Sequence, residues 1–177
     1  CAVIAMLLVM AAAPAHAETL VDIYGPGQNQ INLSMASPLT APGQQAKSLG
    51  SELHTAINTD LNLLPFMRLT PDSAVLGGTV LQGWKGDTVD FKRFQIAGAD
   101  LLVTAYWPSG DSGEQTVELR VFETFSGKFV FGNAYSNVSH QTVPETADRF
   151  CDDLMEALTG ARGFFSGTLA FVKGNGR

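Results

Sequence analysis

The sequence of 177 residues lacks the features that mark several specialised classes of protein. It contains two cysteines, too few for a disulfide scaffold, and it has no cluster of Lys and Arg of the kind that nucleic-acid binding requires. The longest apolar run, over residues 1–13, is too short to cross a bilayer, which takes about 20 residues. With 45% hydrophobic residues and a formal net charge of −6, the chain is also unlike an intrinsically disordered protein. The remaining class is a globular domain that is long enough to bury a core without cross-links.

The first 17 residues differ in composition from the rest. They contain no Asp, Glu, Lys or Arg, and all but Pro14 and His16 are apolar. The stretch ends in Ala-His-Ala, the small-x-small pattern at which a signal peptidase cuts. We therefore expect a signal peptide over residues 1–17 whose basic initial segment is missing, and a mature chain that starts at Glu18 outside the cytoplasm. A buried core helix is the alternative interpretation of the same composition.

Hydrophobic periodicity predicts an alternation of strands and helices in the mature chain. Alternating apolar residues predict a half-buried strand at 30–36, and apolar residues at 3.6-residue spacing predict a helix at 44–63 that Pro65 ends. The continuous apolar run at 101–107 predicts a central strand that is buried on both faces. The other expected elements are strands at 19–24, 66–69, 117–125, 128–135 and 164–172 and a short helix at 91–95.

A second long helix is expected from about Thr142 to Gly160. Thr142 and Glu145 have the spacing of a capping box, Pro144 suits the first turn, and Gly160 suits the C-terminal cap. One face of this helix is expected to be buried, with the residues Val143, Ala147, Phe150, Cys151, Leu154 and Leu158. The order of elements predicts an α/β fold in which helices pack on a mixed β-sheet.

The mature sequence shows little recognisable catalytic chemistry. It has no G-x-S-x-G or H-E-x-x-H motif, and we expect His54 and His140 to be solvated or capping residues. Cys151 falls on the apolar stripe of the last helix, so it is expected in the core. No cluster of Cys and His offers the ligands of a zinc site, and we expect no cofactor.

An acidic cluster on the last helix is the one concentration of ligand-like side chains. Asp152 and Glu156 are four residues apart and share a helix face, with Asp153 beside them. We expect a solvated helix face here. The alternative is that these carboxylates hold a cation or perform acid–base chemistry.

The succession of segments resembles the amino-terminal domain of the TolB family, periplasmic proteins of the Tol–Pal envelope system. The segment 158–172, L-T-G-A-R-G-F-F-S-G-T-L-A-F-V, is similar to the family's L-T-G-x-x-G-x-F-x-T-x-I-A-[FY]-V, and 98–104, G-A-D-L-L-V-T, is similar to its G-A-D-x-L-V-x-G strand. The resemblance extends over residues 18–172, with departures at 30–37 and at 147–152, where the family's His is missing. It implies that 173–177 begin a link to the β-propeller that follows in family members.

The resemblance implies a non-enzymatic periplasmic adaptor in an envelope of the Gram-negative type. Relatives bind the inner-membrane protein TolA through an extended amino-terminal arm and the lipoprotein Pal through the propeller. The resemblance implies that these contacts maintain outer-membrane integrity and support envelope constriction at division. Neither nucleic acid nor a membrane span in the mature chain is expected. The arm in this sequence comprises Glu18, Thr19, Leu20, Val21, Asp22, Ile23, Tyr24 and Gly25.

An extended apolar segment of this kind could add a strand to the edge of a partner's sheet. The alternative is that residues 19–24 form the first strand of the chain's own sheet. Two other functions remain open from the sequence. One is a periplasmic domain that binds a small molecule or a cation through Asp152, Asp153 and Glu156. The other is an exported hydrolase, which requires a deep pocket that joins His140 to a Ser and an Asp.

Overall fold

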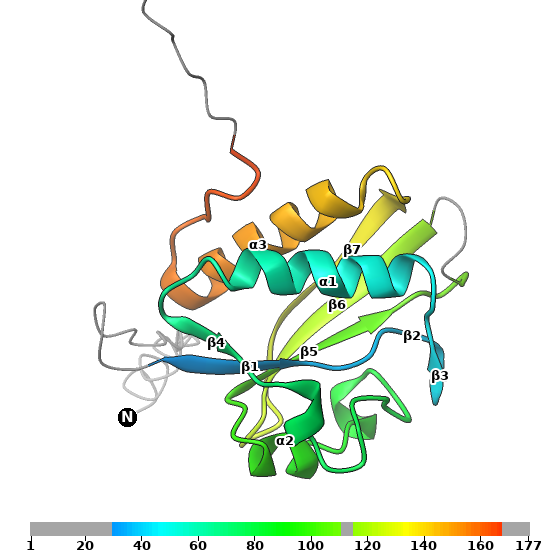
Figure 1. Cartoon of the computed structure of the whole chain (residues 1–177), viewed down its shortest axis with the longest axis vertical. Coiled ribbons are helices and arrows are strands. Elements are labelled where there is room, and N and C mark those ends of the chain that lie inside the picture. Colours follow the sequence, from blue (N-terminus) through cyan, green and yellow to red (C-terminus); the bar gives the residue numbers. More distant parts are fainter. Residues whose placement is uncertain (1–29, 111–114, 168–177) are drawn as a thin grey trace, which may run out of the picture.

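A mixed seven-stranded sheet, with helices on both faces, organises the computed structural model, which describes residues 30–110 and 115–167 (Figure 1). The strands are β1 (Ile31–Met35), β2 (Leu39–Ala41), β3 (Gln44–Gln45), β4 (Met67–Leu69), β5 (Leu101–Tyr106), β6 (Gln115–Glu123) and β7 (Phe129–Val138). The α-helices of the described ranges are α1 (Leu49–Leu61), α2 (Lys92–Ile96) and α3 (Val143–Thr159), and two short 3₁₀ turns lie at Asp72–Ala74 and Gly86–Thr88. The prediction of an α/β fold is confirmed.

Strand β5 lies at the centre of the sheet. It runs parallel to β1 and β2 on one side and antiparallel to β6 on the other. Strand β1 also pairs in parallel with β4, and β6 forms a hairpin with β7. Helices α1 and α3 lie side by side over one face of the sheet, and α2 lies on the opposite face (Figure 1).

The two faces of the sheet carry separate buried clusters. The larger cluster joins the apolar stripes of α1 and α3 to side chains such as Leu33 and Val103, whereas the smaller one joins Phe94 of α2 to Leu39 and Leu102. Because Leu102 and Val103 are neighbours on β5, this strand contributes to both clusters. The prediction that the apolar run at 101–107 is buried on both faces is therefore confirmed.

The structure corrects the predicted start of the first long helix. Gln44 and Gln45 form β3, which pairs antiparallel with β2 after a turn in which Gly43 has a φ of 69°. Helix α1 therefore begins at Leu49 rather than at residue 44. The predicted half-buried strand at 30–36 is also wrong in one respect. Strand β1 pairs with a strand on each edge, and Ser34, on the face that was expected to be solvated, is fully buried.

The predicted capping box at the start of α3 is wrong. The Thr142 hydroxyl donates to the Asn137 carbonyl (2.8 Å) and accepts from the Ser139 N–H (2.9 Å), so it caps the preceding turn instead of the helix. Pro144 does lie in the first turn, and Gly160 ends the helix with a left-handed φ of 74°. All six residues of the predicted apolar stripe are buried.

Two other expectations fail near the ends of strands. The strand predicted at 117–125 ends earlier, because β6 stops at Glu123 and Phe125 lies beyond it with its side chain 69% exposed. Residues 164–167 form a turn instead of the start of a strand, and 168–172 lie outside the described residues. Across the described ranges, no helix combines the length and apolarity that a membrane span requires.

Gly50, near the start of α1, allows this helix to approach the sheet. A Cβ atom at this position would lie 3.2 Å from Pro38 Cβ and 3.3 Å from Trp107 Nε1, and closer still to Ala46 Cβ. We expect Gly50→Ala to lower the free energy of unfolding by about 1–3 kcal/mol through overpacking, although alanine favours an isolated helix by about 1 kcal/mol. Urea denaturation measures the change. The exposed neighbour provides the control, since Ser51→Ala should change stability by no more than about 0.5 kcal/mol, and a stabilised Gly50→Ala variant would contradict the packing argument.

Candidate functional site

The predicted partner-binding arm, Glu18–Gly25, lies outside the described residues. The described chain starts at Gln30 and enters β1 at Ile31, whose N–H donates to the Phe66 carbonyl (2.8 Å). The assignment of the arm as a binding segment therefore stays a prediction. The candidate features that can be examined lie on α3, at the start of α1 and at one end of the sheet.

Asp152 on α3 holds the chain that follows the helix. Its side chain is fully buried, and its carboxylate accepts hydrogen bonds from the N–H groups of Phe165 (2.8 Å) and Ser166 (3.0 Å) and from the Ser166 hydroxyl. Burial alone would raise the pKa of Asp152, but the hydrogen bonds from Ser166 and Phe165 and the nearby charge of Arg162 hold this pKa below its ordinary value. The prediction of a solvated helix face is wrong for this residue.

The other two carboxylates of the predicted cluster have separate environments. Asp153 accepts hydrogen bonds from the Tyr135 hydroxyl (2.6 Å) and from Asn133 Nδ2 (2.8 Å), while Glu156 is exposed. Burial, together with the hydrogen bond to Asp153, raises the pKa of the Tyr135 phenol. Within ranges 30–110 and 115–167, no three side chains of His, Cys, Asp or Glu gather in a way that could hold a metal ion.

His140 joins the start of α1 to the turn before α3. Its Nδ1 lies 2.8 Å from Glu52 Oε1, and its Nε2 lies 3.4 Å from the Ser48 hydroxyl oxygen. This is the order of groups in a serine hydrolase relay, but it lies in an open surface hollow of about 330 Å³, where the side chains of His140 and Glu52 are 57% and 49% exposed. The deep pocket that the hydrolase hypothesis required is not found here. His54 is half-buried, and its Nδ1 accepts from Asn58 Nδ2 (3.2 Å).

Two carboxylates that the sequence analysis did not single out interact between α1 and α3. Burial and then the negative charge of Asp148 raise the pKa of Asp60 from its ordinary 3.8 to about 6. Burial also raises the pKa of Asp148, with contributions from Asp152 and Glu145. Cys151 is fully buried and its thiol pKa is raised, mainly by burial, which keeps the thiol protonated. The prediction that Cys151 packs in the core is confirmed.

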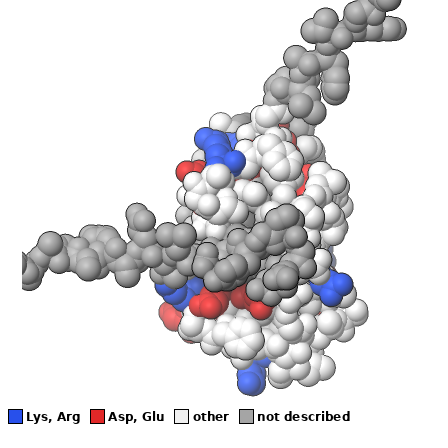
Figure 2. All heavy atoms as spheres, turned by 90° about the vertical axis from the view of Figure 1, so that its left-hand side faces the viewer, with Lys and Arg blue, Asp and Glu red and all other residues white. Residues whose placement is uncertain are grey.

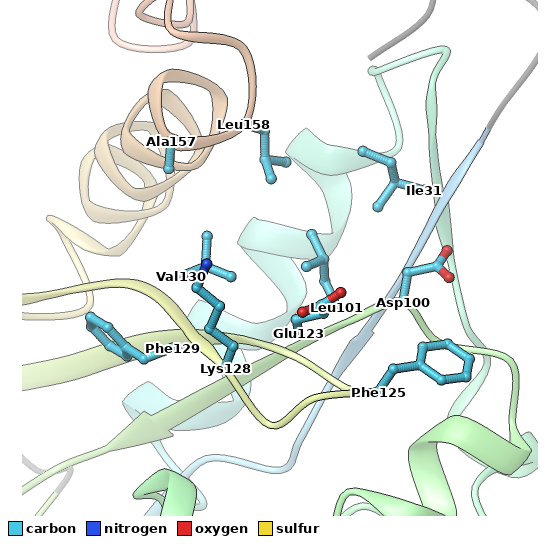
Figure 3. A pocket seen from close by; sticks show the side chains of 10 residues that line it. All are labelled: Ile31, Asp100, Leu101, Glu123, Phe125, Lys128, Phe129, Val130, Ala157 and Leu158. Atoms are coloured by element: carbon cyan, nitrogen blue, oxygen red, sulfur yellow. The ribbon is translucent and has the colours of Figure 1, made fainter. Parts of the chain in front are cut away.

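An apolar groove of about 470 Å³ lies at the end of the layer between α3 and the sheet (Figure 3). The residues that line it come from the starts of β1, β5 and β7, the end of β6 and the last turn of α3: Ile31, Asp100, Leu101, Glu123, Phe125, Lys128, Phe129, Val130, Ala157 and Leu158. Most of these side chains are apolar. Sequence reasoning missed the groove because its parts are far apart along the chain, and because Phe125 was included in the strand predicted at 117–125.

The charged side chains of the groove are partly held by neighbours. Asp100 Oδ2 accepts hydrogen bonds from the Asn32 N–H (2.8 Å) and from Asn32 Nδ2 (3.1 Å), and Glu123 Oε2 accepts one from the Ser126 hydroxyl (2.5 Å). These bonds fix two carboxylates beside an otherwise apolar wall. Such a surface can bind apolar side chains and a cation.

The sequence of this chain is similar to the sequences of curated TolB proteins. A Tol-Pal system protein TolB from Nitratidesulfovibrio vulgaris is 57% identical over 158 residues, which is 89% of this chain and 36% of that protein. A Tol-Pal system protein TolB from Geobacter metallireducens is 31% identical over 153 residues, which is 85% of this chain and 34% of that protein. The chain thus spans about a third of the length of these curated relatives. No model of a protein family matches it.

A solved structure supports the same fold. The crystal structure of TolB from Acinetobacter baumannii has a TM-score of 0.56 and 18% sequence identity, and it matches over 82% of this chain and 32% of its own. At this level of identity the similarity concerns the fold alone.

The buried carboxylate of Asp152 yields a test of the segment after α3. We expect Asp152→Asn to lower the free energy of unfolding by about 2 kcal/mol, because an amide replaces an acceptor that faces three donors. Hydrogen exchange of the amides of Phe165 and Ser166 should become faster. Glu156→Gln is the control, an exposed carboxylate on the same helix, for which neither quantity should change; equal effects at both positions would refute the role of Asp152.

The raised pKa of Asp60 predicts a dependence of stability on pH. A carboxyl whose pKa is higher in the folded chain binds more protons there, so its contribution to stability is lost as the pH rises from about 4 to about 6. Asp60→Asn removes this penalty, and we expect a gain of about 1 kcal/mol at pH 7.5, a value reduced for partial exposure to water, but none at pH 4. Thermal denaturation at both pH values measures the difference. Asp72→Asn, at an exposed turn, should show no such dependence, and a gain for Asp60→Asn that is equal at both pH values would exclude the mechanism.

Proposed function

The chain is a TolB-like domain, and we propose that it works as a non-enzymatic adaptor of the Tol–Pal envelope system in the periplasm. In this role it binds partner proteins, which maintains the integrity of the outer membrane and supports constriction of the envelope at division. The proposal assigns the function to protein–protein contacts rather than to a reaction.

The observation that carries this proposal is the identity of 57% over 89% of the chain with a Tol-Pal system protein. The use of polar side chains in the fold supports it. Asp152 and Asp153 bind groups of the same chain, and His140 pairs with Glu52. These side chains therefore stabilise the arrangement of α1, α3 and β7, and the hydrogen bonds they make leave the contacts with partners to other surfaces.

We assign the contact with TolA to the arm Glu18–Gly25, and a contact with Pal to the part of the relatives that this chain does not span. The arm is separated from β1 by residues 26–30, which include Pro26 and Gly27 and so favour a change of direction. Its apolar residues are Leu20, Val21 and Ile23, the ones that we expect to contact the partner. Such a segment can form main-chain hydrogen bonds with the edge of a partner's sheet, while its side chains give selectivity.

Replacement of the apolar side chains of the arm tests this assignment. We expect the combined change Leu20→Ser, Val21→Ser and Ile23→Ser to weaken binding to TolA by tenfold or more, because the apolar anchors of the added strand are lost. Isothermal titration calorimetry measures the affinity, and thermal denaturation of the same variant reports on the fold. The melting temperature should not change if the arm acts as a binding segment.

The polar residues of the same segment provide the matched control. The variant with Glu18→Gln and Asp22→Asn should retain most of the affinity for TolA. If the apolar variant binds TolA as tightly as the original chain, the arm does not carry the contact. If it instead lowers the melting temperature, residues 19–24 belong to the chain's own sheet, as the alternative interpretation holds.

A further inference from the structure

We infer that the apolar groove at the end of the α3–sheet layer is a second protein-binding surface, which takes a partner segment that combines apolar side chains with a Lys or Arg. The inference extends the proposed adaptor function, and it concerns a surface distinct from the arm Glu18–Gly25. It rests on the exposure of aromatic side chains, on the charges at the groove and on the path of the chain after α3.

The groove exposes large apolar side chains that a folded domain ordinarily covers. Phe125 is 69% exposed and Phe129 is 50% exposed, and both border the hollow of about 470 Å³. The ring of Phe129 packs edge-on against the buried ring of Phe122 (centroids 5.8 Å apart), which shares the α2 side of the sheet with Leu102, so Phe129 lies at the rim of the hollow and Phe125 is its exposed aromatic anchor. Exposed aromatic residues on a rigid support are the usual anchors of a protein interface.

The charges at the groove select for a cationic partner. The charged residues among the described ones that line it are Asp100, Glu123 and Lys128, and Asn32 and Ser126 hold the two carboxylates by hydrogen bonds. Figure 3 shows these carboxylates among the apolar side chains of the groove. The described surface on this side of the molecule is largely uncharged, with Asp and Glu near its middle and Lys and Arg beside them and toward its edges (Figure 2). A partner residue with a positive charge beside apolar anchors would complement this pattern.

The chain after α3 turns away from the groove. Gly160 reverses the direction of the chain through its left-handed conformation, and Asp152, two turns earlier on the helix, holds Phe165 and Ser166. Phe165 packs on the core from there. The segment 161–167 therefore returns along α3, and Ala157 and Leu158 remain on the wall of the groove.

Selection from a peptide library identifies what the groove binds. Random twelve-residue peptides displayed on phage are panned against the full chain, and enriched peptides are synthesised and measured by fluorescence anisotropy. We expect enriched sequences to combine two or more apolar residues with Lys or Arg. The absence of enrichment over a surface without protein would overturn the inference.

Two pairs of variants locate the binding. Ala157→Trp fills the groove from an exposed helix position, and it should weaken binding by tenfold or more, whereas Ala74→Trp, at the exposed 3₁₀ turn Asp72–Ala74 that does not line the groove, should not. Glu123→Lys should weaken binding severalfold, whereas Glu156→Lys, on the exposed face of α3, should not. Selected peptides that bind the Ala157→Trp variant with unchanged affinity would also overturn the inference.

Two further measurements separate this inference from its alternatives. A synthetic peptide with the sequence of residues 18–29 tests whether the chain's own arm binds the groove. If this peptide binds the groove more tightly than every selected peptide, the groove is a binding site for the arm and the partner assignment is wrong. Binding of TolA to the Ala157→Trp variant should remain at the level of the original chain. The arm variants therefore test the adaptor proposal, and the Ala157→Trp variant tests the groove as a binding surface.

Discussion

The burial of β5 on both faces is the constraint from which the rest of the structure follows. A strand with no solvated face needs apolar cover above and below the sheet, because each uncovered side chain would lose the free energy that burial provides. Helices α1 and α3 supply one layer, and α2 with its flanking turns supplies the other. On its two edges β5 pairs with β1 and β2 and with β6, so its backbone groups are satisfied as well. The polar contacts of the helix ends and the apolar groove therefore lie at the ends of these layers.

The polar groups near the ends of the helices fix how the chain enters and leaves each layer. His140 and Glu52 bind the start of α1 to the turn before α3, and Asp152 binds the segment after α3 back to the helix. A buried carboxylate is unfavourable unless it is well hydrogen-bonded, which is why Asp152 is retained together with three donors. Asp60 lacks such a set of donors among the hydrogen bonds described above, and its pKa is raised by burial and by the charge of Asp148.

The sequence was sufficient to predict features that depend on local periodicity. The stripe on α3, the double burial of β5 and the left-handed cap at Gly160 follow from side-chain spacing and from one glycine, and the structure confirms them. The resemblance to TolB domains also predicted the fold, and the relatives agree with it. Periodicity failed where a longer-range contact decided the outcome. Thr142 has the spacing of a capping residue, but the preceding turn offers it nearer partners in Ser139 and Asn137.

Candidate site residues were harder to predict for the same reason. Helical spacing places Asp152 on an acidic face, but its environment depends on a segment that returns from 13 or 14 residues further along the chain. The groove is harder still, because four strands and a helix contribute to it, and no local pattern marks a hollow that forms where they end. In this domain, polar groups such as Asp152 form hydrogen bonds within the chain. Apolar side chains and a few carboxylates of the groove are left for contact with other molecules. Because apolar contact is largely indifferent to sequence, the placed charges of Asp100 and Glu123 would decide which partner segments bind, and the exposed ring of Phe125 with the apolar wall of the groove would supply most of the affinity.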